Sequence, residues 1–153
     1  MSTDLALLIW LTESTYNGRS FNGPSLVETL SGYSLDQVVS TETFEGYTIY
    51  GVVWHLMLWK QQLARALGST LDEVLSEESD FAAPPEDLTQ DAWKGMLAQM
   101  DAIHAAYVAA LKAFPAERLG EKMPWGCSYG EGAAWMATHD TYHTAMIRNM
   151  GVK

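Results

Sequence analysis

Cysteine and basic residues are both scarce in this sequence. The 153 residues contain a single cysteine, which excludes a disulfide within the chain and is typical of a reducing cytoplasm. Nine lysines and arginines stand against nineteen aspartates and glutamates, and the formal net charge is −10. Because such a chain repels phosphate groups, we expect neither nucleic acid nor an anionic membrane as a partner.

Long hydrophobic runs are also missing. The apolar run from Leu5 to Leu11 is too short for a membrane span, and it follows Asp4 rather than a basic residue. We therefore expect neither a signal peptide nor a transmembrane helix. With 48% hydrophobic residues over 153 positions, the chain can bury a core of its own. These features predict one soluble, cytoplasmic domain over residues 1–153.

Alternating strand patterns are absent, whereas helical periodicity is strong in four segments. We expect long helices over residues 4–16, 47–67, 89–113 and 128–150. The second shows the spacing of a buried helical face, with apolar side chains at Val52, Leu56, Trp59 and Leu63. Four helices of this kind predict an all-α four-helix bundle.

The connection between the first two long helices, residues 17–46, is expected to be partly helical. It contains two capping-box patterns, in which a serine and a residue three positions later cap the start of a helix. These are Ser25-x-x-Glu28 and Ser34-x-x-Gln37. Two similar patterns lie outside this connection: Thr70-x-x-Glu73 follows the second long helix, and Ser128-x-x-Glu131 opens the last one. The bundle is thus predicted to have a long, partly helical crossover between its first two long helices.

Three histidines fall on the inward sides of two of the expected helices, the second and the last. His139 and His143 lie four residues apart on the last helix and share its apolar stripe. That stripe comprises Trp135, Tyr142, Met146 and Met150. His55 lies at the shoulder of the second helix's stripe. Inward-facing imidazoles need partners for both ring nitrogens, and a divalent metal would supply one partner to all three residues at once.

The spacing of the pair alone does not distinguish a metal site from a packed interior, since both arrangements place two imidazoles on an apolar stripe. Three histidine ligands would leave coordination positions open, as in a reactive rather than a structural site. Imidazole suits zinc and nickel, and also iron(II). The sequence therefore predicts a divalent transition metal as cofactor and does not choose among these three.

Three further residues are weaker candidates. His104 is either a fourth ligand, a donor behind the ligands, or a packed core residue, and we favour the last interpretation. Cys127 precedes the last helix, where the helix dipole favours a thiolate, but without a second cysteine or a nearby histidine we interpret it as incidental. Asp140 lies about 100° round the helix from His139, so we expect it to face solvent or to orient a neighbouring group.

Three stretches carry a likeness to a known family. They are FNGPSLVETLSGYSLDQV at 21–38, VWHLMLWKQQLARALG at 53–68 and ATHDTYHTAMIRNM at 137–150. Together they resemble the DinB/YfiT-like superfamily of bacterial four-helix-bundle proteins, with the likeness running over residues 4–150. The resemblance implies a metal held by His55, His139 and His143, and a homodimer. One departure is that many members have Gly-Gln-Ile after the last histidine, where this chain has Ala145-Met146-Ile147.

The resemblance also implies a function, because characterised members transfer low-molecular-weight thiols to electrophiles or use them to isomerise small acids. We expect a metal-dependent transferase that takes a small thiol and a small-molecule substrate. One alternative is a metal-dependent hydrolase, which needs a general base, and no carboxylate falls in the helical stripes. The other is a non-catalytic, stress-response protein that binds a metal or small ligand, which the departure at Ala145-Met146-Ile147 favours.

Overall fold

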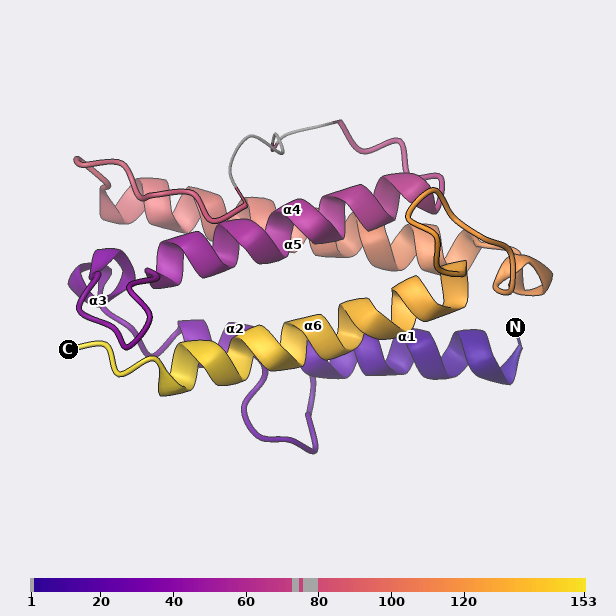
Figure 1. Ribbon diagram of the computed structural model, residues 1–153, viewed down its shortest axis with the longest axis horizontal. Helices are drawn as coiled ribbons and strands as arrows, with labels where there is room; N and C mark the ends of the chain where they lie inside the picture. Colours follow the sequence, from indigo (N-terminus) through magenta and orange to yellow (C-terminus); the bar gives the residue numbers. More distant parts are fainter. Residues whose placement is uncertain (1, 73–74, 76–79) are drawn as a thin grey trace.

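Four long helices form the body of the protein in a computed structural model that describes residues 2–72, 75 and 80–153 (Figure 1). They are α1 (Thr3–Tyr16), α4 (Ile49–Ala66), α5 (Gln90–Ala113) and α6 (Tyr129–Asn149). Two short helices, α2 (Leu26–Leu30) and α3 (Leu35–Val39), lie between α1 and α4, and one 3₁₀ turn, η1 (Ala116–Arg118), precedes α6. The predicted all-α bundle with a long, partly helical first connection is confirmed.

Side-chain caps explain where the helices begin. The Ser128 amide donates to Glu131 Oε2 at 2.7 Å and the Ser128 hydroxyl accepts from the Glu131 amide at 3.2 Å, which is the predicted capping box of α6. Ser34 and Gln37 form the same reciprocal pair at α3, and the Ser25 hydroxyl accepts from the Glu28 amide at α2. The fourth pattern includes Glu73, which lies outside the described residues.

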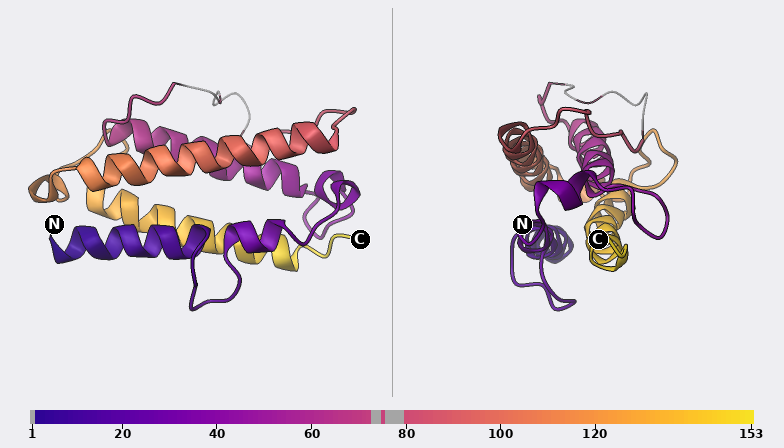
Figure 2. Two further views of the ribbon diagram at one scale, coloured as in Figure 1. Left: turned by 180° about the vertical axis from the view of Figure 1, so that it is seen from behind. Right: turned by 90° about the vertical axis from the view of Figure 1, so that its left-hand side faces the viewer.

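The four long helices occupy the corners of a square in cross-section (Figure 2). α4 packs on α5 and α6, and α1 packs on the same two helices, so that α1 and α4 are diagonal neighbours. α4 and α5 run in the same direction, and the connection between them, residues 67–89, therefore joins opposite ends of the bundle (Figure 1). The sequence had indicated only the first connection as long.

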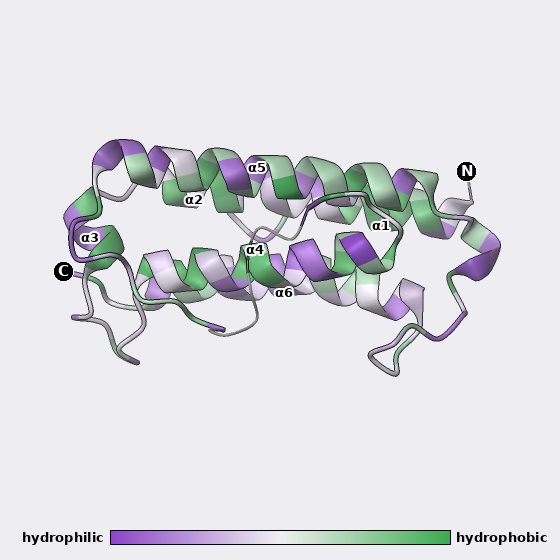
Figure 3. Ribbon diagram, turned by 90° about the horizontal axis from the view of Figure 1, so that it is seen from above, coloured by the Kyte–Doolittle hydropathy of each residue, from purple (hydrophilic) through white to green (hydrophobic). Residues whose placement is uncertain are grey.

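The core lies between these helices, and each helix carries both hydrophobic and hydrophilic residues along its length (Figure 3). Buried apolar residues form two clusters along the bundle axis. One is centred on α4, α2 and the first half of α5, and the other on α1, the end of α4 and the second half of α5. None of the helices in the described part of the chain is long and apolar enough to cross a membrane.

The buried face of α6 differs from the predicted stripe. Trp135 and Tyr142 are 60% and 67% exposed, whereas Asp140 is fully buried. On this face Gly132 is closely packed, because a Cβ atom there would approach Met123 Sδ to 2.9 Å. The residues that face the core are Gly132, Ala133, Met136, Ala137, Asp140, His143, Thr144 and Ile147. The expectation that Asp140 faces solvent is therefore wrong.

Candidate metal centre

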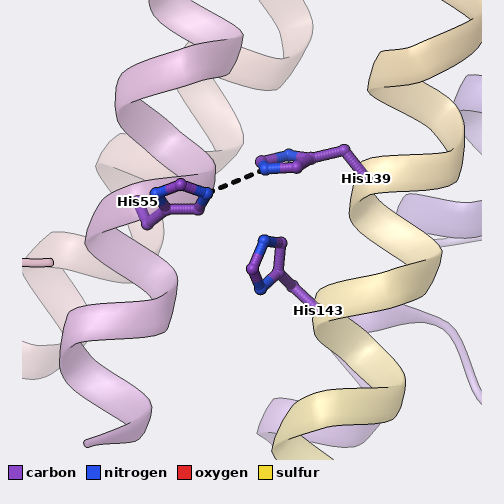
Figure 4. A group of neighbouring side chains, drawn as sticks. All are labelled: His55, His139 and His143. Atoms are coloured by element: carbon purple, nitrogen blue, oxygen red, sulfur yellow. Dashed lines mark hydrogen bonds between the residues drawn. The ribbon is translucent and has the colours of Figure 1, made fainter. Parts of the chain in front are cut away.

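Three imidazoles from two neighbouring helices point toward one another (Figure 4). His55 comes from the second turn of α4, and His139 and His143 come from consecutive turns of α6. Each offers one ligand nitrogen, and these three atoms all lie within 4.8 Å of one another. His55 and His143 are buried and His139 is half-buried. The structure thus brings together the three residues that the sequence predicted; we call them the histidine cluster.

Asp80 contacts this cluster from the connection between α4 and α5. Its Oδ1 lies 2.8 Å from His55 Nδ1 and also accepts a hydrogen bond from Trp59 Nε1 at 2.8 Å. A carboxylate only accepts hydrogen bonds, so His55 Nδ1 carries the proton and His55 Nε2 presents its lone pair. Carboxylates orient metal-binding histidines in this way. Sequence reasoning missed Asp80, since it lies in a loop without helical periodicity.

The close approach of two ring nitrogens, one from His55 and one from His139, bears on whether a metal ion fits the cluster. His55 Nε2 lies 2.9 Å from His139 Nε2, so the lone pair fixed by Asp80 points at a second ring nitrogen. Two lone pairs at this distance repel each other unless a proton or a metal ion lies between them. In addition, the buried Nδ1 atom of His143 has no hydrogen-bond partner among the described residues. The donor set and its geometry therefore fit a divalent transition metal.

Burial keeps the α6 imidazoles neutral at neutral pH. Burial, together with the neighbouring His143 and His55, lowers the pKa of His139 from 6.5 to about 3. Burial and His55 lower the pKa of His143 to about 4. Because the neutral imidazole is the form that coordinates a metal, these shifts leave both ligands available without loss of a proton.

A cleft of about 370 Å³ opens beside the cluster. Its walls are mainly apolar and aromatic, and the residues that line it are His55, Trp59, Asp80, Trp125, Gly132, Trp135, Met136 and His139. Trp59 and Trp125 meet edge to face with ring centroids 5.9 Å apart, and Phe81 stacks on His55 at 4.2 Å. A small molecule in this cleft would therefore contact the histidine ligands on one side and tryptophan rings on the other.

The weaker candidates lie elsewhere. His104 contacts Lys60 and stacks on Tyr16 with ring centroids 3.6 Å apart, and it does not belong to the group of convergent ligand atoms. Cys127 is partly buried and packs against the second apolar cluster, the one that includes α1. It immediately precedes Ser128, the N-cap of α6. Asp140 does not belong to the group of convergent ligand atoms either and pairs with Lys60. None of the three is placed as a ligand.

Comparison with known proteins supports the resemblance. No curated protein and no solved structure matches the chain significantly. The family model of the DinB superfamily matches residues 22–147, which include α2 to α5, most of α6 and all three members of the histidine cluster. Since that match covers most of the chain, the protein belongs to the DinB superfamily.

Proposed function

We propose that this protein binds one divalent transition metal through His55, His139 and His143. The observation that carries the proposal is the 2.9 Å approach of His55 Nε2 to His139 Nε2, with Asp80 holding the opposite nitrogen of His55. Imidazole ligands favour zinc or nickel and also accept iron(II). Three protein ligands leave room for a small molecule at the same ion, which is typical of reactive sites.

We further propose that the site joins the sulfur of a low-molecular-weight thiol, which loses its proton, to an electrophilic carbon, which loses a leaving group that takes the bonding electron pair. The bound metal would supply one effect, namely a lowered pKa of a coordinated thiol. The protein's own side chains then have distinct tasks. Asp80 orients His55, while Trp59, Trp125 and Trp135 form the walls that hold the electrophile. These apolar walls also keep water from competing with the thiol as the nucleophile.

A hydrolase remains the second candidate, and Asp80 is the observation that favours it. Its carboxylate lines the cleft and is 55% exposed, which provides the general base that the helical stripes lack. We rank this candidate lower, because Asp80 Oδ1 already accepts hydrogen bonds from His55 and Trp59. A third candidate, a protein that binds the metal or a small ligand without catalysis, is favoured by Ala145-Met146-Ile147 in place of Gly-Gln-Ile.

The experiment is to load the protein with Zn²⁺ or Ni²⁺ and to incubate it with a panel of small thiols and a model electrophile. We expect thioether formation above the uncatalysed rate, and loss of this excess in His143→Ala. Thr138→Ala is the matched control, because Thr138 is an exposed residue of the same helix. Cys127→Ser should react like the wild type, since no base lies beside that thiol in the sequence.

The outcomes separate the three candidates. If the loaded protein matches the uncatalysed rate with every thiol but turns over esters or amides in a metal-dependent manner, the hydrolase replaces the transferase. If the protein binds metal and neither substrate class reacts, the non-catalytic function is supported. A protein that binds no metal at all contradicts the proposal as a whole.

A further inference from the structure

A fully buried ion pair joins the two helices that carry the histidine cluster. Lys60 Nζ of α4 donates to Asp140 Oδ2 of α6 at 2.6 Å. The side chains are 2% and 0% exposed, so both charges lie inside the bundle. Asp140 directly follows His139 in α6, and Lys60 lies five residues after His55 in α4. The ion pair therefore connects the same two helices close to the imidazoles.

The other long helices complete the surroundings of Lys60. Its ammonium lies 3.4 Å from His104 Nδ1 of α5 and 4.7 Å from the centroid of the Tyr16 ring of α1. Tyr16 in turn stacks on His104 and donates its hydroxyl hydrogen to Asp101 at 2.5 Å. We call Tyr16, Lys60, His104 and Asp140 the lysine cluster; each of the four long helices contributes one member.

Such a cluster is a poor source of stability. Removing two charges from water costs free energy that their attraction only partly returns, and apolar residues of similar size often serve a core equally well. A buried pair does, however, penalise every arrangement in which its partners fail to meet, because an unpaired charge would then remain inside the protein. Its effect is therefore to select one register of the two helices that it joins.

We propose that the Lys60–Asp140 ion pair sets the register of α4 against α6 and so holds His55 opposite His139 and His143. A shift of either helix by one residue would move its side chains by about 1.5 Å along the axis and 100° around it, which is enough to separate the imidazoles. Both residues act through the histidines and are positioning residues. The inference rests on the proposed metal site. It states that the spacing of the three imidazoles is determined by an ion pair that is not itself one of the ligands.

The test removes both charges together, in the double variant Lys60→Met with Asp140→Leu, and leaves neither an unpaired charge nor an unpaired amide in the core. Because the pair contributes little net stability, we expect unchanged helicity and a melting temperature within about 5 °C of the wild type. We expect the dissociation constants for Zn²⁺ and Co²⁺ to rise by about tenfold or more, as when groups behind metal ligands are replaced. The visible absorption bands of bound Co²⁺ should also change, since they report ligand geometry.

A matched control removes an ion pair that joins two other helices. Lys112 of α5 donates to Glu13 of α1 at 3.0 Å, and both side chains are about half exposed. Lys112→Met with Glu13→Gln makes the same change of charge on the surface of the bundle. It should leave the metal affinities and the Co²⁺ spectrum unchanged.

The outcomes distinguish this inference from the proposed function. If the wild type binds neither Zn²⁺ nor Co²⁺, the metal site itself is wrong and the inference fails with it. If the wild type binds and the folded double variant binds equally well with the same spectrum, only the inference is overturned. Should the double variant not fold, Asp140→Glu keeps both charges and changes only the reach of the pair; unaltered affinity and spectrum in that variant overturn the inference.

Discussion

The histidine cluster and the lysine cluster both include residues of α4 and α6. The lysine cluster contains a cation, the Lys60 ammonium, whereas the histidine cluster contains only imidazoles. His139 and His104 are both neutral imidazoles, and burial lowers the pKa of each to about 3. His104 Nδ1 lies 3.4 Å from the Lys60 ammonium, whereas His139 Nε2 lies 2.9 Å from another imidazole nitrogen. Burial alone therefore does not mark a metal ligand. The two histidines differ in the group that the ring nitrogen faces, which is an ammonium for His104 and a second imidazole for His139.

Replacing a ligand gives the largest effect that this comparison predicts. His139→Ala removes one of three nitrogen ligands, and we expect the affinity for Zn²⁺ to fall by more than about 100-fold, beyond the effect of losing a group behind a ligand. The measurement is metal content by elemental analysis together with a competitive titration. Thr138→Ala, on the exposed side of α6, serves as the control and should retain one metal per chain. Retention of tight binding in His139→Ala would contradict the assignment of the histidine cluster.

Removing the metal should lower stability at neutral pH. Metal at a hundredfold excess over its dissociation constant stabilises the folded state by about 2.7 kcal/mol. For a chain of this size, we expect a chelator to lower the melting temperature by about 5–10 °C at pH ~7.5. Addition of Zn²⁺ in excess over the chelator should restore it. Identical melting curves with and without chelator would show that no metal is linked to folding.

Asp80→Asn should weaken metal binding without abolishing it. The amide can still accept a hydrogen bond from His55 Nδ1, but it no longer carries the charge that fixes the orientation and proton of that ring. We expect a loss of about 10–100-fold in Zn²⁺ affinity, which is smaller than the loss for His139→Ala. Isothermal titration would measure it. Asp87→Asn, in the same connection, is the matched control for the change of charge.

The lysine cluster should show its effect in the pH dependence of stability. Burial, then the charges of Lys60 and Lys112, lower the pKa of His104 from 6.5 to about 3. Between these values the unfolded chain binds a proton that the folded protein does not, so the free energy of unfolding falls as the pH is lowered below about 6.5. One such group contributes at most about 1.4 kcal/mol per pH unit.

His104→Gln removes this contribution and leaves an acceptor for the Lys60 ammonium. In the metal-free protein, urea unfolding between pH ~6.5 and ~4 should therefore show a shallower pH dependence than in the wild type. The histidine cluster contributes to the slope in both proteins, so the difference between them isolates His104. Equal slopes would indicate that His104 takes up its proton at an ordinary pH in the folded state.

Much of the fold follows from local signals in the sequence. The first residues of α6 and α3 were predictable, because a serine and its partner three residues later cap the start of the helix by contacts within one turn. The buried face of α6 was not predictable. Trp135 and Tyr142 were placed on the buried stripe by their helical spacing. Which face is buried depends instead on packing against segments distant in sequence, such as Leu63 of α4, which lies beside Gly132.

The candidate site divides in the same way. The histidine cluster was predictable, since two members lie one helical turn apart and the resemblance supplied the third. Asp80 and the Lys60–Asp140 pair were not, because loops have no periodicity and charged residues are usually exposed. In each case the partner lies on another segment, 25 residues away for Asp80 and His55 and 80 residues away for Lys60 and Asp140. Only the folded structure shows such pairings.

The packing of α1 on α5 and α6, rather than on α4, has a consequence during synthesis of the chain. Leu5 and Ile9 of α1 are buried in the structure, yet α5 and α6, the helices on which α1 packs, emerge from the ribosome after α4. While α4 and α5 can pair early and α1 can pack on α5, α1 gains its other neighbour only when α6 has been made, and His55 meets its two partners only then. Closure of the bundle and assembly of the histidine cluster are thus one event, so a nascent chain is unable to complete the cluster before α6 has been made.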